Sequence, residues 1–245
     1  MVDYKVAVIT GATSGIGAAV AEKFAEEGKF VVLVGRSNQL GNALESKIKI
    51  SGNSAQFIKC DVSSECSVFE FAKHIEKLYG RVDVLFNNAG IMLQSKELER
   101  LPQEEWKQTF DSNLNSIFYM TKHLKKMIIS CKGCIINNGS IAGMHSYVAG
   151  HSYAYSASKA AIIQFTRQMA LNHAEEGVRV NCICPGIVDT PILGDRDRDE
   201  YAKRVPLGYV GTPEDVANVV LFLASDSASY LTGVILPIDG GVSLN

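Results

Sequence analysis

The sequence K-V-A-V-I-T-G-A-T-S-G-I-G, from Lys5 to Gly17, joins an apolar, β-branched run to a glycine-rich turn and then to an alanine-rich segment. A buried strand, a tight turn and a helix start follow one another in this order in a βα unit of a parallel sheet. The three glycines let the main chain turn sharply and approach a pyrophosphate at the helix N-terminus. The stretch therefore predicts the first unit of a dinucleotide-binding fold.

The same alternation of strand and helix patterns continues along the whole chain. The strand patterns are Lys5–Thr10, Phe30–Val34, Ala55–Cys60, Val82–Phe86, Cys134–Asn137, Val178–Cys184 and Gly233–Ile238, and helical periodicity covers about residues 15–28, 39–50, 64–79, 103–130, 153–175 and 213–224. Such alternation predicts a parallel sheet covered by helices on both faces. We expect a single Rossmann-like, doubly wound α/β domain over residues 1–245, with a seven-stranded, mostly parallel sheet. Its cofactor half is expected in residues 1–110 and its catalytic and substrate half in residues 111–245.

The composition argues against several classes of protein. With 24 Lys and Arg against 26 Asp and Glu, the net charge is −2, which gives no broad field for nucleic acid or an anionic membrane. No apolar run approaches a membrane span, and the first strand pattern leaves no room for a signal peptide. Cys131 and Cys134 have C-x-x-C spacing, but no second pair or histidine stands at ligand spacing, so no metal is expected. We expect a cytoplasmic protein with six reduced cysteines.

The end of the second strand pattern bears on the choice of dinucleotide. The sequence there is V-L-V-G-R-S, ending in Gly35, Arg36 and Ser37. An acidic residue at this point would hold the ribose 2′-hydroxyl of NAD and repel a 2′-phosphate, whereas an arginine can form a forked contact with the phosphate. The sequence therefore favours NADP(H), with NAD as the alternative if Arg36 only stacks on the adenine or lies in solvent.

Two further motifs follow at strand ends, C-D-V at 60–62 and N-N-A-G at 87–90. With T-G-x-x-x-G-I-G, they resemble the short-chain dehydrogenase/reductase family over essentially the whole chain. The resemblance implies an NAD(P)-dependent oxidoreductase that interconverts a secondary alcohol and a ketone. The expected cofactor contacts are Gly11, Thr13, Ser14, Gly15, Ile16, Gly17, Arg36, Ser37, Asp61, Val62, Asn87, Ala89, Gly90, Tyr155, Lys159, Pro185, Gly186, Ile187 and Thr190. Thr190 has a second reading as a helix N-cap before Pro191.

The spacing of three tyrosines distinguishes one of them as a catalytic candidate. Tyr155 and Lys159 are four residues apart, so both side chains fall on one face of a helix. A free tyrosine has a pKa of about 10, and a cation held beside the phenol lowers that value towards the range of a useful base. Neither Tyr147 nor Tyr153 has a lysine or arginine four residues on.

The resemblance extends the catalytic set to Asn113, Ser140, Tyr155 and Lys159. Ser140 would hydrogen-bond the substrate oxygen as charge develops there, and Asn113 would hold a water that connects the lysine to a proton path. The family usually has a pair of serines where this chain has Gly139 and Ser140, so the role is assigned to Ser140 alone.

Other functional classes were weighed against this one. A serine hydrolase is disfavoured because no G-x-S-x-G nucleophile elbow exists in the chain. A nucleotide-binding protein without turnover remains the alternative from another class. The intact catalytic set argues against it, because a mere binder would tolerate the loss of each member.

The substrate is the least determined feature. The loop from Ile141 to Tyr153 includes Tyr147 and His151, which we expect to contact substrate together with Ser140 and Tyr155. Its mixture of apolar and hydrogen-bonding residues favours a small or bulky amphipathic ketone or alcohol such as a hydroxysteroid. A sugar or polyol is an alternative, and so is a 3-oxoacyl group on acyl carrier protein. The last is ranked lower because Glu175 and Glu176 stand where a basic docking residue is common in such reductases.

Two surface features complete the expectations. The charge run D-R-D-R-D-E at 195–200 is either an exposed connection or a mobile cover over a site. The helix patterns around Asn113 and Tyr155 carry apolar side chains that are expected on their outer faces, with the alternative that all of them face the sheet: Ile117, Phe118, Ile162, Phe165 and Met169. With the family resemblance, this pattern predicts a homo-oligomer, a tetramer built on these helices.

Overall fold

A single parallel sheet forms the centre of the molecule. The computed structural model of the chain describes residues 4–93, 97–145, 152–195 and 197–244. The strand order is β3-β2-β1-β4-β5-β6-β7, and all six neighbouring pairs are parallel. The strands are β1 (Val6–Thr10), β2 (Phe30–Gly35), β3 (Ala55–Lys59), β4 (Val84–Asn87), β5 (Cys134–Asn138), β6 (Arg179–Pro185) and β7 (Ile235–Ile238). The predicted doubly wound, seven-stranded sheet is confirmed.

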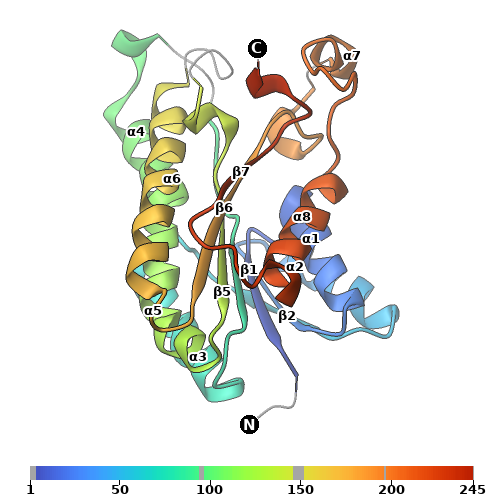
Figure 1. Ribbon diagram of the computed structural model, residues 1–245, viewed down its shortest axis with the longest axis vertical. Coiled ribbons are helices and arrows are strands. Elements are labelled where there is room, and N and C mark those ends of the chain that lie inside the picture. Colours follow the sequence, from blue (N-terminus) through green and yellow to red (C-terminus); the bar gives the residue numbers. More distant parts are fainter. Residues whose placement is uncertain (1–3, 94–96, 146–151, 196, 245) are drawn as a thin grey trace.

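Helices cover both faces of this sheet (Figure 1). On one face lie α1 (Gly15–Glu26), α2 (Asn38–Ile50) and α8 (Pro213–Ala224); on the other lie α3 (Glu65–Leu78), α5 (Ser116–Ser130) and α6 (Tyr153–His173). The remaining helices are α4 (Gln103–Phe110) and α7 (Arg198–Ala202), and short helical turns occur at Leu98–Arg100, Ile141–Gly143, Pro191–Leu193, Asp226–Ala228 and Val242–Leu244. The short α7 lies inside the 195–206 region that the sequence left without a predicted element.

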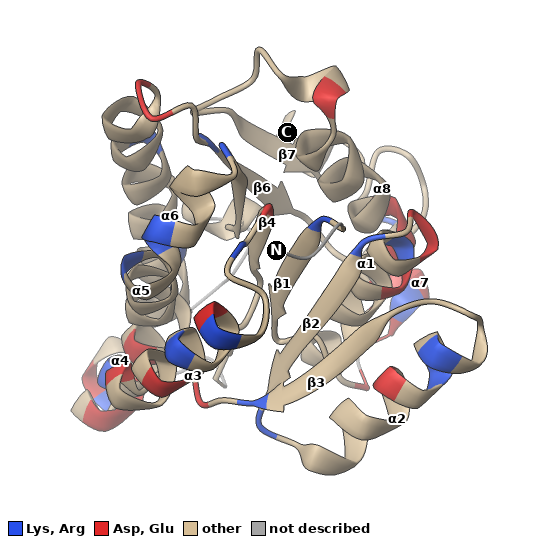
Figure 2. Ribbon diagram, turned by 90° about the horizontal axis from the view of Figure 1, so that it is seen from below, with Lys and Arg blue, Asp and Glu red and all other residues tan. Residues whose placement is uncertain are grey.

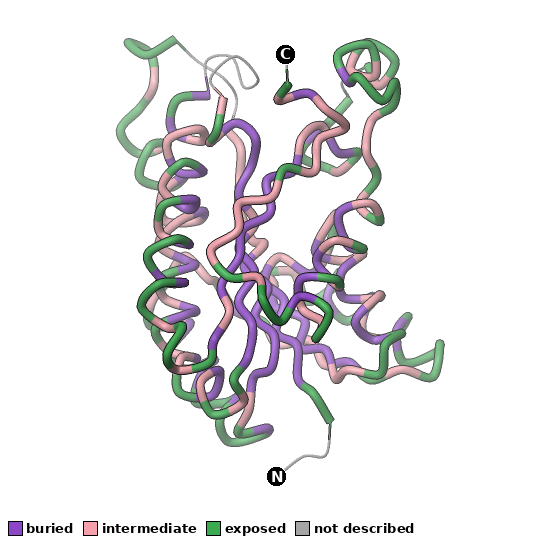
Figure 3. The backbone as a smooth tube through the Cα atoms, viewed as in Figure 1, coloured by how far each residue is buried: buried purple, intermediate pink, exposed green. Residues whose placement is uncertain are grey.

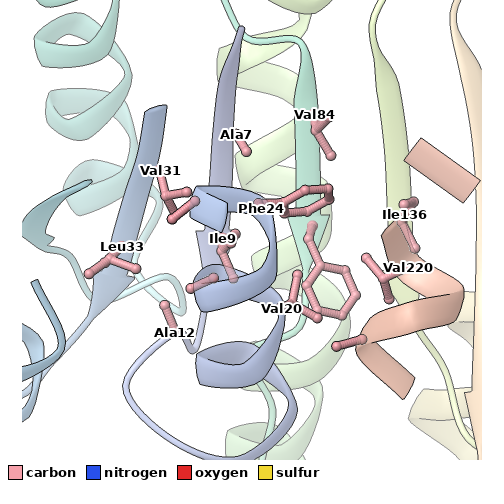
Figure 4. Close-up of a cluster of buried hydrophobic side chains, with 14 of the residues drawn as sticks. Ala7, Ile9, Ala12, Val20, Phe24, Val31, Leu33, Val84, Ile136 and Val220 are labelled. Atoms are coloured by element: carbon pink, nitrogen blue, oxygen red, sulfur yellow. The ribbon is translucent and has the colours of Figure 1, made fainter. Parts of the chain in front are cut away.

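The core explains why the central strands read as continuous apolar runs. Four consecutive residues of β1, Val6–Ile9, are fully buried, because alternate side chains enter the layers on opposite faces of the sheet. On the α1 side, Phe24 and Val20 pack with Ile9 and with Val220 of α8 (Figure 4). Truncating a fully buried phenylalanine such as Phe24 costs about 3–5 kcal/mol, so this layer contributes strongly to the stability of the fold.

In the helices on the α6 side, buried residues lie on the side that faces the sheet and exposed residues on the outer side (Figure 3). Ile117, Ile162 and Met169 are buried within the chain, so the prediction that they form an outer apolar face is wrong. Phe165 is partly buried against the core, and Phe118 is 44% exposed. The error arises because an apolar residue on a long helix has the same sequence pattern whether the sheet or a partner covers it.

One helix expected over residues 103–130 is divided in the structure. A π-helical turn at Asp111–Asn115 separates α4 from α5. The wider turn places Asn113 inside the protein, where its amide bonds to the main chain of Ile91 and to Ser158. Single π turns inserted into α-helices are common at functional sites, and this one positions a predicted catalytic residue.

The surface and the topology set the context for the site. Lysine and arginine are interspersed with aspartate and glutamate over the helices in Figure 2. Among the described residues, no helix is both long enough and apolar enough to cross a bilayer. Strand β1 has β2 on one side and β4 on the other, so the crossovers leave in opposite directions at this point. Ligands bind at such switch points, beyond the carboxyl ends of the strands.

Candidate active site

A cavity of about 660 Å³ lies at the switch point. Most predicted site residues line it: Gly11, Thr13, Ser14, Gly15, Ile16, Arg36, Asp61, Val62, Ala89, Gly90, Ser140, Tyr155, Lys159, Pro185, Gly186, Ile187 and Thr190. Four predicted residues do not line it, namely Gly17, Ser37, Asn87 and Asn113. Two predicted substrate contacts, Tyr147 and His151, lie outside the described residues. The fold therefore gathers residues from positions 11 to 190 around one hollow.

The glycine-rich turn forms a cradle that side chains would fill. Gly11 and Gly15 have φ angles of +61° and +52°, which favour glycine. A Cβ on Gly17 would lie 2.2 Å from the Gly11 carbonyl oxygen, so Gly17 serves the close packing of helix and turn and makes no contact with the cavity. The first turn of α1 has no acidic residue, and the Ser14 side chain does not cap it. The N–H groups at the N-terminus of α1 thus have neither a side-chain cap nor a nearby carboxylate, which suits the binding of a dinucleotide pyrophosphate.

Arg36 and Asp61 line the cavity near the ends of β2 and β3. Asp61 accepts hydrogen bonds from the main chain and hydroxyl of Ser63 at 3.1 and 2.7 Å. Arg36 is exposed and forms no ion pair or hydrogen bond with any described residue, which leaves its guanidinium available for a ligand. Ser37 instead caps α2 by accepting the Leu40 N–H at 3.3 Å.

The N-N-A-G motif uses its two asparagines in different ways. Asn87 is 2% exposed and donates to Asn137 across the sheet at 2.9 Å. Asn88 lines the cavity, donates to the Thr10 and Gly11 carbonyls, and accepts from Asn138 at 2.9 Å. Successive side chains of a strand point to opposite faces, so only one of the two could reach the cavity. Asn87 was the cofactor contact predicted from the sequence. Strand alternation alone could not show which of the two asparagines faces the cavity.

Ser140, Tyr155 and Lys159 all line the cavity. Ser140 follows β5, is 8% exposed, and accepts the Ala142 N–H at 3.1 Å, which fixes its hydroxyl. Tyr155 and Lys159 share a face of α6, with the Lys159 Nζ 5.6 Å from the centroid of the phenol ring. A hydrogen-bonding group, a phenol and an ammonium thus line one cavity, and the four-residue spacing correctly predicted that the phenol and the ammonium share a helix face.

The electrostatics of this group differ from the expectation for the isolated pair. Burial raises the pKa of Tyr155, and a side-chain hydrogen bond with Ser140 opposes that rise. Burial also lowers the pKa of Lys159 to about 8. The expected lowering of the Tyr155 pKa by Lys159 is not realised in the protein alone. The reason is that the Lys159 Nζ donates at 2.7 Å to the Asn138 carbonyl, while loss of hydration dominates at the phenol.

Asn113 supports the site from behind. Its Oδ1 accepts the Ile91 N–H at 2.8 Å, and its Nδ2 donates to the Ile91 carbonyl at 3.1 Å and to the Ser158 hydroxyl at 3.0 Å. A Cβ on Gly90 would lie 3.0 Å from the Asn113 Oδ1 and 3.8 Å from the Lys159 Nζ. Asn113 and Lys159 therefore approach the same point on the main chain of the N-N-A-G segment.

Two buried thiols explain the glycine before Ser140. Cys182 and Cys184 lie on one side of β6, and their Sγ atoms are 4.0 Å apart. A Cβ on Gly139 would lie 2.8 Å from the Cys182 Sγ and 3.0 Å from the Cys184 Sγ. The thiols occupy the space that a serine side chain would need, so the departure from the family's serine pair has a packing cause.

The segment after β6 closes the cavity over the glycine-rich turn. Pro185, Gly186, Ile187 and Thr190 line the cavity. The Thr190 side chain lies over Gly15, where a Cβ would come within 3.2 Å of its methyl group. Its hydroxyl donates to the Val188 carbonyl at 3.4 Å and makes no cap bond to the helical turn that follows. Thr190 nevertheless occupies the N-cap position of the turn Pro191–Leu193 with an extended backbone, as its second reading expected, although its side chain makes no capping hydrogen bond.

Several lining residues were missed by sequence reasoning. Asn138 ends β5, and a polar residue at the carboxyl end of a buried strand was a usable signal. Tyr201 and Arg204 reach the cavity from α7 and the residues just after it. Both residues follow the run D-R-D-R-D-E, and no sequence pattern indicated this contact, because it depends on how segments far apart in the sequence pack together. None of the described residues between 195 and 200 lines the cavity, so the reading of this run as a cover over the site stays a prediction.

Comparison with known proteins gives full-length similarities. A family model described as enoyl-(acyl carrier protein) reductase matches residues 11–243. The chain is 36% identical to the 3beta-hydroxysteroid dehydrogenase of Mediterraneibacter gnavus, over 98% of this chain and 95% of that protein. It is 38% identical to a 3-oxoacyl-(acyl-carrier-protein) reductase of Chlamydia muridarum, over 98% and 97% of the two chains. A tryptophan variant of actinorhodin polyketide ketoreductase, solved with NADPH, superposes with a TM-score of 0.92 at 31% identity, covering 99% of this chain and 98% of that one.

Proposed function

The chain belongs to the short-chain dehydrogenase/reductase family, and on that premise we propose that it is an NADP(H)-dependent enzyme interconverting a secondary alcohol and a ketone. The observation that carries the proposal is the convergence of Ser140, Tyr155 and Lys159 in one cavity that also receives the glycine-rich turn. The bound nicotinamide would give or take the hydride. The protein's own part is to hold the substrate oxygen and to move its proton.

Tyr155 is the residue that we assign to proton transfer. In the reductive direction its hydroxyl donates to the carbonyl oxygen as that oxygen gains charge, and in the oxidative direction the phenolate accepts the proton. Ser140, whose hydroxyl is fixed by the Ala142 N–H, donates a second hydrogen bond to the same oxygen. Lys159 supplies the positive charge that stabilises the phenolate, and Asn113 holds the main chain of Ile91 beside it.

The preference for NADP(H) rests on Arg36. Its exposed guanidinium lines the cavity near the end of β2 and has no partner among the described residues. A guanidinium matches a phosphate monoester in geometry as well as charge. Asp61, the one acidic side chain in the described lining, is held by Ser63 at the end of β3, which leaves Arg36 to meet the 2′-phosphate. The NADPH in the ketoreductase structure is consistent with this assignment.

The substrate that we favour is an amphipathic ketone or secondary alcohol of the hydroxysteroid kind. Ile192 and Leu193 give the cavity an apolar wall, and Tyr201 and Arg204 add polar groups to it. The similarity to a 3beta-hydroxysteroid dehydrogenase supports this class.

A second candidate substrate is a 3-oxoacyl thioester on acyl carrier protein. Similarity to a reductase of that name is of the same order as similarity to the steroid enzyme. The described surface gives one argument against it. Glu176 forms an ion pair with Lys125 at 3.5 Å and a hydrogen bond with His173 at 2.7 Å, so Lys125 at this edge already has an internal partner. Docking of an acidic carrier would have to compete with this ion pair.

We further propose a cytoplasmic homo-oligomer, a tetramer by analogy with the family. Phe69 of α3 and Phe118 of α5 are 43% and 44% exposed, which leaves aromatic surface on the helical layer that covers one face of the sheet. All six cysteines are free, in keeping with a reducing compartment. Sedimentation velocity at micromolar concentration measures the assembly, and a purely monomeric profile contradicts it.

A turnover screen tests the proposed function. Ketones and alcohols from steroid, sugar and acyl-thioester classes are offered with NADPH/NADP and with NADH/NAD, and nicotinamide absorbance is followed. We expect reduction of at least one ketone, faster with NADPH than with NADH. Absence of turnover with every compound, although the dinucleotide binds, would favour the non-catalytic alternative.

A further inference from the structure

The distribution of charge in the cavity lining is uneven. The cationic side chains there are Arg36, Lys159 and Arg204, and the one carboxylate in the described lining is Asp61. Arg36 and Asp61 lie at the ends of β2 and β3, and Lys159 is committed to Tyr155 and the Asn138 carbonyl. Arg204 is the cation that the proposed reaction leaves without a role.

The main chain at Arg204 is anchored although its side chain is exposed. The next residue, Val205, is 6% exposed and belongs to the buried cluster that contains Ile141 and Ile162. These two residues come from the turn after Ser140 and from α6. The anchor therefore places Arg204 on the catalytic side of the cavity, away from Arg36.

A second anchor lies at the N-terminal end of α7. Arg198 donates to the Asp189 carboxylate at 2.7 Å and to the Gly194 carbonyl, which ties α7 to the segment after β6. Tyr201, one turn before Arg204, also lines the cavity and has the Arg204 guanidinium 5.1 Å from its ring centroid. The guanidinium is thus held over an aromatic ring at the border of the site.

The ion pair that Arg204 forms within the protein is weak, and a ligand can replace it. Its Nη2 forms an ion pair with Glu200, and the two side chains are 59% and 60% exposed. Exposed pairs of this kind contribute about 0–1 kcal/mol because water and salt screen them. A guanidinium has five donors, so a ligand oxyanion can displace the glutamate or share the arginine with it.

We propose that Arg204 binds an anionic group of the substrate remote from the reacting carbon, so that the enzyme prefers keto or hydroxy acids to their neutral analogues. The inference rests on the proposed function and narrows its substrate class. Ile192 and Leu193 line the cavity as well, and they fit an apolar body between the reacting carbon and the anion. The shared chemistry is an oxyanion, which either the carboxylate of a small acid or the phosphate of a pantetheine arm can supply.

Matched substrate pairs test the proposal. The pairs are a keto bile acid and its methyl ester, oxocyclohexanecarboxylate and its methyl ester, and acetoacetyl-pantetheine with and without its terminal phosphate. We expect the wild type to prefer the charged member of at least one pair. Arg204→Met should lower that preference, as a ratio of kcat/KM values, by about 10- to 100-fold, the range for one charge-assisted hydrogen bond. Arg204→Lys should retain part of it as a point charge.

The control is Lys203→Met, which removes one positive charge from the neighbouring, exposed residue that does not line the cavity. It should leave the ratio within about twofold, since an exposed charge outside the site acts only through the screened field. Preference in the keto-acid pairs identifies a carboxylate as the anion, and preference in the pantetheine pair alone identifies a phosphate. Equal use of charged and neutral members by the wild type, or a ratio unchanged in Arg204→Met, overturns the proposal.

Calorimetry separates this inference from the proposed function. Binding of the keto bile acid to the wild type and to Arg204→Met is measured in the presence of NADP. If the wild type binds the keto bile acid tightly and Arg204→Met does not, the anion site is supported. If the wild type then shows no turnover, the proposed reaction is contradicted. If turnover occurs and does not depend on Arg204, the proposed reaction is supported and the proposed anion site is contradicted.

Discussion

The Lys159 Nζ lies 5.6 Å from the centroid of the Tyr155 ring and donates a 2.7 Å hydrogen bond to the main-chain oxygen of Asn138. The ammonium is therefore held near the phenol by the end of β5 as well as by α6. Because Lys159 is only 4% exposed, the charge is kept where water cannot screen it. Keeping a buried ammonium in this place costs stability, because the folded state disfavours the charge.

Tyr155→Phe should abolish turnover and preserve the fold. The substitution removes the hydroxyl that transfers the proton, and we expect kcat to fall by about 10²- to 10⁴-fold, the usual contribution of a positioned acid or base. Dinucleotide affinity, measured by fluorescence titration, should change little. Tyr119→Phe, on α5 and not in the cavity lining, is the control and should keep wild-type turnover. Wild-type activity in Tyr155→Phe would show that another group transfers the proton.

Lys159→Met should inactivate the enzyme and stabilise it at neutral pH. Burial lowers the pKa of Lys159 to about 8 from an ordinary value of 10.5, so the folded state disfavours the charge. The lysine thus costs stability, on the order of 3 kcal/mol below pH 8, and the cost fades as pH rises towards the unfolded value. Thermal unfolding of the wild type and of Lys159→Met from pH 6 to pH 11 measures the difference in stability between the two proteins. A variant less stable than wild type at pH 7 would contradict this account.

Gly139→Ser should destabilise the protein although serine is the family's usual residue there. The new Cβ would press on the Cys182 and Cys184 sulfurs, and overpacking of this kind costs about 1–3 kcal/mol. Adding Cys182→Ala to Gly139→Ser should recover part of the loss. The free energies of unfolding of wild type, both single variants and the double variant give the coupling energy. Simple additivity would mean that the thiols are not the obstacle.

Arg36→Leu should weaken the preference for NADPH over NADH. Loss of a charged, forked contact with the 2′-phosphate should lower the kcat/KM ratio for the two cofactors by about 10- to 100-fold. The value for NADH alone should change little, because NADH has no phosphate at this position. Lys59→Met removes a charge from the neighbouring end of β3 without altering the cavity lining, and its ratio should stay near wild type. If the wild-type enzyme prefers NADH, the role assigned to Arg36 is wrong.

Local sequence was sufficient for the sheet and for the residues of the central site. The apolar run of β1 and the glycine-rich turn define one βα unit, and the four-residue spacing of Tyr155 and Lys159 requires only a helix to bring the two together. Both signals depend on neighbours along the chain, where periodicity and main-chain geometry are reliable guides.

Contacts between distant segments were decided by tertiary structure. The sequence could not show that Asn88 rather than Asn87 reaches the cavity, that a π turn carries Asn113 inward, or that Cys182 and Cys184 exclude a side chain at Gly139. Nor could it bring Arg204 to the border of the site. Each depends on which faces pack together, because burial and close contact are set by the whole three-dimensional arrangement. The sequence by itself determined the fold and the pairing of Tyr155 with Lys159 on one helix face, and packing decided which side chains surround them.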